Sequence, residues 1–259
     1  MNKIAISKNE YNSKNKPFPY LVQENILEEL FAKNIQKEIL EIEDDKWDRY
    51  DNPFEGKYTL RSKENMPENC EKLFCYLNSD EFIKELSEIV GINLFPDPTK
   101  NFWGIHKYKD GDHLDIHVDA GRHPTTFQKK QVTLGIYLSK DWKEENRGHL
   151  EIWKGENCSN DNAKILECKE RVLPSFNKLI VFTCDDFAWH GNPVPVICKN
   201  NERRIFLTMS YLSEEQDNYD NKRVKAFFVP RPDDKYDEKK DILRFLRADP
   251  EKYKEIYRT

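Results

Sequence analysis

The chain has 259 residues, enough for one or two domains of ordinary size. Its 12% aromatic residues argue against disorder, and its net charge of −5 argues against a generally basic nucleic-acid-binding protein. No apolar run approaches the ~20 residues of a membrane span, and charge flanks Ile4–Ile6, so we expect neither membrane contact nor a signal peptide. Six scattered cysteines, without a Cys-x-x-Cys pair, predict reduced thiols in a cytoplasmic protein.

The first part of the chain predicts a strand followed by a helix. Residues 1–17 are polar, and we expect them to be frayed, whereas residues 18–22 are typical of a short strand. Between Asn25 and Ile42 the apolar residues recur at steps of three and four, which predicts an amphipathic helix. Residues 43–70 have no such period and predict a loop with short strands.

A second helix is predicted at 80–90, with Ser79 as its N-cap and Gly91 directly after its end. From residue 101 to residue 212 the pattern changes to short β-rich runs that are separated by turn residues, without helices between them. The eight runs cover residues 101–109, 114–118, 131–138, 148–154, 170–173, 178–184, 193–198 and 203–212. Runs of this kind predict an antiparallel sandwich or barrel.

The C-terminal tail returns to a helical pattern. Residues 237–248 predict a helix whose apolar side chains face a core, namely Ile242, Leu243, Phe245 and Leu246. Asp249-Pro250-Glu251 has the N-cap and first-turn proline of a further helix. We predict a single domain over residues 1–259, with strand and helical support in 1–100, a β core in 101–228 and a helical extension in 229–259.

The densest cluster of ionisable side chains is the run from His113 to Asp119. With a period of two, His113, Asp115, His117 and Asp119 share one face of a strand, and the intervening apolar residues share the other. Burying four ionisable groups on one face is unfavourable unless something binds them, and a divalent metal is the simplest candidate. A solvated strand face explains the pattern about equally well, so the cluster alone is weak.

Two later features make the metal hypothesis more specific. His190 follows an apolar strand and precedes Gly191, so it lies at a strand end, where a loop can aim it. Alternation from Arg204 onwards puts Arg204 and Thr208 on one face and Arg203 on the other, and an inward arginine with a hydroxyl can clamp a carboxylate. Two histidines and one carboxylate form the facial triad of non-haem Fe(II) oxygenases.

With these features the sequence resembles the 2-oxoglutarate/Fe(II)-dependent dioxygenases, specifically the prolyl-4-hydroxylase-like branch that includes the hypoxia-inducible-factor prolyl hydroxylases. The resemblance covers about residues 101–228, and the opening strand also resembles the usual start of the family. The matching segments are residues 18–22, 132–142, 148–153, 177–182 and 204–208. The resemblance implies a double-stranded β-helix, that is, a cupin-like jelly roll of about eight strands, in which helices from both ends of the chain buttress one sheet.

The resemblance also implies roles for individual residues. The iron ligands it implies are His117, Asp119 and His190, and we prefer His117 and Asp119 over the overlapping pair His113 and Asp115 because they lie where the strand ends. The residues implied to hold 2-oxoglutarate are Arg204, at its distal carboxylate, and Thr208, Tyr108, Tyr137 and Leu150. Candidate substrate contacts are Arg122, His123, Trp189 and Asn192. The Pro-Val-Pro insertion lengthens the spacing between His190 and Arg204, so we expect the loop at 191–202 to differ from that of relatives.

The activity that the resemblance implies is hydroxylation of an unactivated C–H bond. It needs Fe(II), with 2-oxoglutarate and O₂ as co-substrates and ascorbate as a reductant, and it releases succinate and CO₂. A prolyl residue of a peptide or protein is the first substrate hypothesis; a small molecule, an amino acid or a sugar is the second. A non-catalytic cupin-like metal-binding module is the alternative from another class. No basic stripe or nucleic-acid motif supports a nucleobase substrate.

Overall fold

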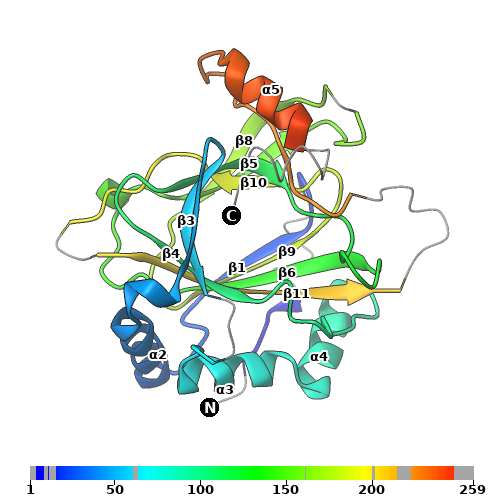
Figure 1. Ribbon diagram of the computed structural model, residues 1–259. Helices are drawn as coiled ribbons and strands as arrows, with labels where there is room; N and C mark the ends of the chain where they lie inside the picture. Colours follow the sequence, from blue (N-terminus) through cyan, green and yellow to red (C-terminus); the bar gives the residue numbers. More distant parts are fainter. Residues whose placement is uncertain are drawn as a thin grey trace.

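The protein is described by a computed structural model, which places residues 4–8, 11, 16–60, 64–160, 162–199, 202–214 and 223–247. The described strands form one continuous antiparallel sheet that folds over on itself, so that two layers lie face to face (Figure 1). This is the double-stranded β-helix expected from the resemblance. No helix among these residues combines the length and the apolar character that crossing a membrane requires.

The first layer is built from five strands in the order β1-β9-β6-β11-β4. Their bounds are Tyr20–Glu24, Lys178–Thr183, Lys129–Tyr137, Arg204–Ser213 and Gly104–Tyr108. The second layer has the order β5-β10-β7-β8, with bounds His113–Val118, Trp189–Asn192, Leu150–Gly155 and Ile165–Val172. Strand β3 (Glu55–Leu60) pairs with both β4 and β5 and therefore joins the layers along one side. Two short strands, β2 (Asp48–Asn52) and β12 (Phe227–Phe228), pair with β3 and β5.

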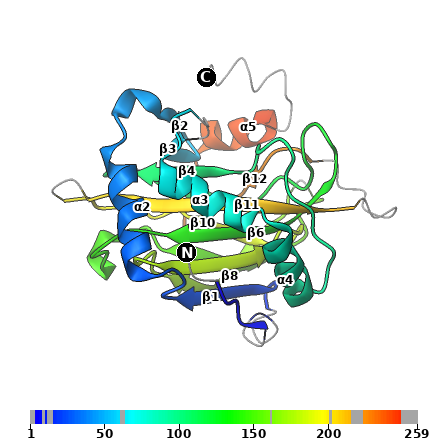
Figure 2. The ribbon, with the colours of Figure 1, turned by 90° about the horizontal axis from the view of Figure 1, so that it is seen from below.

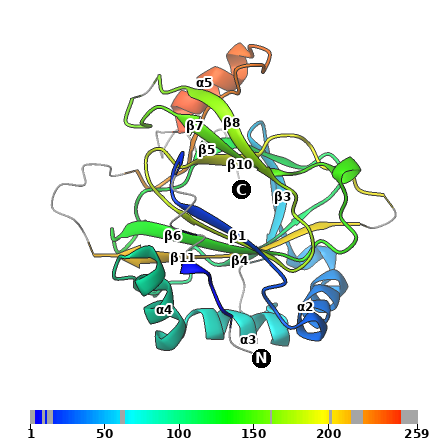
Figure 3. The ribbon, with the colours of Figure 1, turned by 180° about the vertical axis from the view of Figure 1, so that it is seen from behind.

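Three helices cover the outer face of the first layer (Figures 2 and 3). They are α2 (Glu29–Glu41), α3 (Glu68–Leu77) and α4 (Asp80–Val90). Their buried apolar stripes join those of the strands in one core, which includes Ile35, Leu73 and Leu86 of the helices and Ile205 and Leu207 of β11. Burial of these stripes fixes which face of β11 points away from the helices and into the space between the layers.

The predicted start and end of α4 are confirmed. The Ser79 hydroxyl accepts a hydrogen bond from the Phe82 amide at 3.3 Å, and Gly91 ends the helix in the left-handed region at φ 74°. Helix α3 was not expected, and short 3₁₀ turns lie at Asp44–Lys46 and Glu144–Asn146. All six cysteines are free, as predicted.

Two expectations for the chain were wrong. Among the described residues of 1–17, Ile4, Ile6 and Tyr11 are buried in the helix-facing core, so this segment is anchored rather than frayed. The strand expected at 193–198 lies earlier, as β10, and ends at Asn192. The reason is that Pro193 and the proline two residues later have no N–H for a sheet ladder, so this part of the chain continues as a loop.

The C-terminal helix α5 (Glu238–Arg247) also lies elsewhere than expected. It covers the second layer, on the side opposite to the other three helices, and not the same sheet (Figure 1). Ile242 is 52% exposed, so it does not face a core, and Leu243 and Leu246 are half-buried. The side chain of Phe245 and the helix expected from Asp249-Pro250-Glu251 lie outside the described residues.

The contact between Gly135 and Phe206 gives a test of the sheet packing. A methyl group on Gly135 of β6 would overlap the Phe206 ring of the neighbouring strand β11, and this ring also faces Tyr137 with a centroid separation of 4.6 Å. We expect Gly135→Ala to lower the free energy of unfolding by about 1–3 kcal/mol, as overpacking does. Urea unfolding measures the change. In a Phe206→Leu background the same substitution is expected to be less destabilising; an equal loss in both backgrounds would contradict this packing.

Candidate active site

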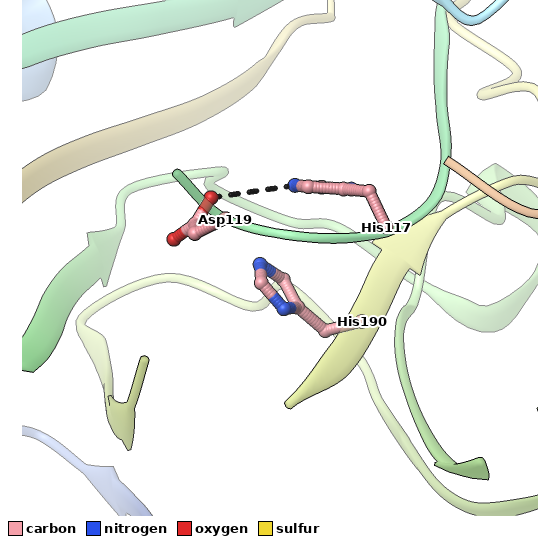
Figure 4. A group of neighbouring side chains, drawn as sticks. All are labelled: His117, Asp119 and His190. Atoms are coloured by element: carbon pink, nitrogen blue, oxygen red, sulfur yellow. Dashed lines mark ion pairs between the residues drawn. The ribbon is translucent and has the colours of Figure 1, made fainter. Parts of the chain in front are cut away.

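Three potential metal ligands meet between the two layers. His117 lies on β5, His190 lies on β10, and Asp119 follows the end of β5 (Figure 4). The antiparallel register places His190 directly opposite His117, and one ligand atom from each of the three side chains lies within 4.8 Å of the others. His117 Nε2 is 3.5 Å from Asp119 Oδ1. The pair His117 and Asp119, preferred from the sequence, is therefore the one that lies beside His190.

The backbone sets which nitrogen of each histidine faces the cluster. His117 Nδ1 lies 2.9 Å from the Asp115 carbonyl, and His190 Nδ1 lies 2.8 Å from the Ala188 carbonyl. A carbonyl only accepts, so each Nδ1 carries the proton and each Nε2 offers a lone pair. Burial, together with the neighbouring His117, lowers the pKa of His190 to about 4. His190 is therefore neutral at neutral pH, as a metal-binding imidazole must be.

The third side chain, Asp119, is held through one of its two oxygens. Its Oδ2 accepts hydrogen bonds from Lys130 Nζ at 2.6 Å and from Thr133 Oγ1 at 3.3 Å, and Oδ1 is left facing His117. Burial raises the pKa of the Asp119 carboxyl, but the charge of Lys130 outweighs it, so the pKa lies well below 3.8. Asp119 is thus an ionised carboxylate with one oxygen free for a metal.

The competing pair, His113 and Asp115, points out of the barrel, which corrects the prediction that all four side chains share one face. The pairing of β5 with β10 shifts by one residue between Leu114 and His117, as a β-bulge does. The alternation is therefore interrupted: Leu114 and His117 line the interior, and Asp115 faces outward. Asp115 forms an ion pair with Lys240 of α5 at 2.5 Å.

A cavity of about 210 Å³ opens beside the three side chains. Most of the residues implied by the resemblance line it, namely Tyr108, Tyr137, Leu150, Arg204, Thr208 and Asn192. Its charged lining residues include two that have buried partners: Lys130 pairs with Asp119, and Lys57 pairs with Glu55 at 2.9 Å. Arg204 is the remaining cation of this lining, so the cavity has an excess of positive charge.

Arg204 enters the cavity because β11 alternates regularly from Arg204 to Tyr211. Arg204, Phe206 and Thr208 line the cavity, and Ile205 and Leu207 face the helices, as predicted. The Arg204 guanidinium carbon lies 4.6 Å from the centre of the Tyr108 ring and 5.1 Å from that of Tyr137.

The polar contacts of Arg204 leave part of its guanidinium open. Its Nε donates to the Gly148 carbonyl at 2.9 Å, but its buried Nη1 has no hydrogen-bond partner within the described part of the chain. A buried guanidinium nitrogen without a partner is unfavourable, and a bound anion could accept the missing hydrogen bond.

Three of the four candidate substrate contacts do not line the cavity. His123 is fully buried; its Nε2 lies 3.1 Å from Asp97 Oδ1 and 2.8 Å from the Thr99 hydroxyl, so it ties two loops together. The buried Arg122 donates to the Phe127 carbonyl, and Trp189 packs in a cluster behind the second layer. Only Asn192 of the four faces the interior.

Sequence reasoning missed Lys130 and Thr133 as cavity residues. Thr133 has the same parity as Tyr137 on β6, so alternation could have found it. Lys130 could not be found in this way, because the pairing of β6 with β11 shifts between Tyr211 and Leu212 and changes the parity at Lys130.

Comparisons with known proteins agree with this geometry. Residues 103–211 match the family model described as the 2OG-Fe(II) oxygenase superfamily, and no curated protein sequence matches the chain. Among solved structures, a Pseudomonas putida prolyl-4-hydroxylase is 14% identical with a TM-score of 0.56, covering 81% of this chain and 100% of its own. A Trichoplax adhaerens prolyl hydroxylase in complex with a hypoxia-inducible-factor peptide is 18% identical with a TM-score of 0.56, covering 80% and 89%.

A third structure comes from a different kind of relative. HygX from Streptomyces hygroscopicus, solved with nickel, 2-oxoglutarate and hygromycin B, is 12% identical with a TM-score of 0.53, covering 86% of this chain and 96% of its own. At these identities the structures establish a shared fold, and the family model covers the strands that carry the three clustered ligands and Arg204. Residues 103–211 are therefore similar to the 2OG-Fe(II) oxygenase superfamily, and the chain shares its fold with the prolyl hydroxylases and HygX.

Proposed function

We propose that the protein is a 2-oxoglutarate-dependent dioxygenase that hydroxylates a prolyl residue of a peptide or protein, with iron held by His117, Asp119 and His190 and 2-oxoglutarate anchored by Arg204. The observation that carries the proposal is a single cavity with a two-histidine, one-carboxylate cluster and an arginine nitrogen without a partner. These are the two features that a keto acid chelating a metal needs at its two ends.

The three side chains fit a divalent iron. Two imidazole nitrogens and one carboxylate oxygen are the donor set that non-haem Fe(II) takes, so these three side chains would hold the iron. Iron bound there with 2-oxoglutarate and O₂ would supply the oxidative chemistry. The chain itself orients the ligands: the Asp115 and Ala188 carbonyls fix the histidine rings, and Lys130 keeps one oxygen of Asp119 occupied.

The far end of the cavity fits the distal carboxylate of 2-oxoglutarate. Arg204 brings a buried positive charge, and Thr208 lies on the same face of β11 as a hydroxyl support. Tyr108 and Tyr137 hold the guanidinium between their rings, and burial raises the pKa of Tyr137 to about 12, so this phenol stays neutral. The wall beside the chain of the keto acid is apolar Leu150.

The size of the cavity favours a substrate that inserts one side chain. At about 210 Å³ it is smaller than the ~300–1,000 Å³ of sites that enclose a drug-sized molecule, and 2-oxoglutarate takes part of it. The loop after β5 and the loop before β10 each expose an aromatic ring, Phe127 at 58% and Phe187 at 44%, and such rings suit contact with the backbone of a peptide. The names of the two neighbours, prolyl-4-hydroxylase and prolyl hydroxylase, state that those proteins act on prolyl residues.

A small molecule is the second candidate, since HygX, which shares the fold, was solved with hygromycin B. Two polar candidates for contact with such a substrate are held elsewhere: Arg122 donates to the Phe127 carbonyl of its own loop, and His123 bonds to Asp97 and Thr99 of another loop. The test is succinate release from 2-oxoglutarate with Fe(II), followed by a screen of prolyl peptides, amino acids and sugars. Stimulation by prolyl peptides together with a mass gain of one oxygen is expected; stimulation by a sugar or free amino acid alone would overturn the peptide assignment.

The first prediction concerns the metal. We expect His190→Ala to weaken Fe(II) or Co(II) binding by more than about 100-fold, because removal of a ligand costs more than loss of a supporting contact. His113→Ala is the matched control, since His113 lies on the same strand pair but lines a different, outer pocket. It should keep metal affinity within about threefold. Metal titration measures both; full binding by His190→Ala would remove this site.

The second prediction concerns the co-substrate. We expect Arg204→Ala to raise the KM for 2-oxoglutarate by roughly 100-fold or more, because the carboxylate loses its buried charge partner. Metal affinity should persist, since none of the three clustered ligands changes. Arg203→Ala is the control: Arg203 precedes the strand and points away from the cavity, so its KM should change by less than about threefold. Equal effects of the two variants would place the keto acid elsewhere.

A further inference from the structure

Three residues that line the cavity have a buried nitrogen without a hydrogen-bond partner within the described residues, namely Arg204, Asn192 and Trp103. The Trp103 ring stacks on Phe74 in the helix-facing core. Asn192, whose unpartnered atom is the side-chain nitrogen Nδ2, is 2% exposed, as is Arg204. A buried amide without a partner is unfavourable, and an apolar side chain of the same size would fill this position without that loss. The Asn192 amide therefore indicates that a ligand accepts a hydrogen bond from Nδ2 at this position.

The strand register places Asn192 on the side of the cavity where Arg204 lies. Asn192 ends β10, and it pairs with Leu114 of β5. Leu114 packs in the same apolar cluster as Tyr108, the ring over which the Arg204 guanidinium lies. On the other side of β10, Gly191 pairs with Glu151 of β7. Because the two strands run antiparallel, Asn192, one residue after Gly191, lies beside Leu150, one residue before Glu151. Asn192 thus lies between two leucines of the cavity wall.

The backbone holds Asn192 in this direction. A Cβ on Gly191 would lie 2.6 Å from the Asp115 carbonyl oxygen and 2.8 Å from that of Leu114, so β5 approaches the chain closely just before Asn192. The close packing restricts rotation of the β10 backbone at Gly191 and so keeps the Asn192 side chain directed into the cavity. His190 and Asn192, one pleat apart, consequently both project into the cavity, one toward the metal ligands and one toward the wall near Arg204.

We propose that the Asn192 amide donates a hydrogen bond to the distal carboxylate of 2-oxoglutarate, as a second anchor beside Arg204. The inference rests on the proposed function, and it moves Asn192 from the substrate to the co-substrate. Two donors from different strands, β10 and β11, fix where the distal carboxylate lies. Asn192 is therefore also a specificity residue, which selects keto acids by the length of chain between their two carboxylates.

The test compares Asn192→Leu, Asn192→Asp and wild-type protein loaded with Mn(II), by calorimetric titration with 2-oxoglutarate without O₂. We expect Asn192→Leu to weaken binding by about 10- to 100-fold, as for loss of a hydrogen bond to a charged group. Asn192→Asp should weaken it further, because two carboxylates then meet. The preference for 2-oxoglutarate over oxaloacetate, which is one carbon shorter, should fall in Asn192→Leu. Asn160→Leu, at an exposed asparagine, is the control and should bind normally.

Two further readouts separate this proposal from its alternatives. Since Nδ2 has no partner in the free protein, Asn192→Leu should keep the Tm and the Mn(II) affinity of the wild type; a lower Tm with unchanged 2-oxoglutarate binding would show a structural role and overturn the proposal.

Arg204→Ala is titrated in parallel. If only Arg204→Ala weakens binding, the second anchor is wrong and the proposed function stands. If neither variant does, both fail. If Asn192→Leu does not fold, Asn192→Ser, which keeps a small polar side chain, decides between the same outcomes.

Discussion

The antiparallel pairing of β5 with β10 is the constraint on which the site depends. This pairing puts His117 opposite His190. In a regular strand His117 and Leu114, three residues apart, would point to opposite faces, but the bulge in β5 lets both side chains point into the cavity. With regular alternation, the two histidines would lie on different faces or the pairing would shift by a residue. The bulge also sends Asp115 outward, where Lys240 neutralises it, and thus keeps a second carboxylate away from the three clustered side chains.

The buried charges of the cavity show which parts of the site the fold completes by itself. Lys130 and Asp119 satisfy each other, as do Lys57 and Glu55, so removal of either partner would strand a buried charge. Arg204 is different: two aromatic rings and one carbonyl support it, but one nitrogen has no partner among the described residues. The fold holds the Arg204 side chain in its binding geometry before the ligand arrives. A ligand carboxylate can therefore accept the missing hydrogen bond without the free-energy cost of reorganising the side chain.

How much of this could be read from the sequence depended on whether a strand was regular. The parity of Arg204 and Thr208 was predicted correctly because β11 runs without interruption through both. The parity of His113 and Asp115 was wrong because a bulge has no signature in the spacing. The roles expected of Arg122 and His123 failed for another reason. Their partners, the Phe127 carbonyl in a tight loop and Asp97 far along the chain, follow from tertiary packing, which local pattern does not contain.

The support of the proposed metal site extends past the last residue of the family match, at 211. Phe228 of β12 pairs with His117 and stacks on its ring with centroids 5.1 Å apart, and Phe54 stacks on the other side of Phe228 at the same separation. Arg223 donates hydrogen bonds to the Val118 and Asp119 carbonyls. Phe228 and Arg223 thus support two of the three residues of the proposed site, His117 through its ring and Asp119 through its backbone. Because the geometry of metal ligands depends on such outer contacts, we expect the site to need these residues beyond the family match.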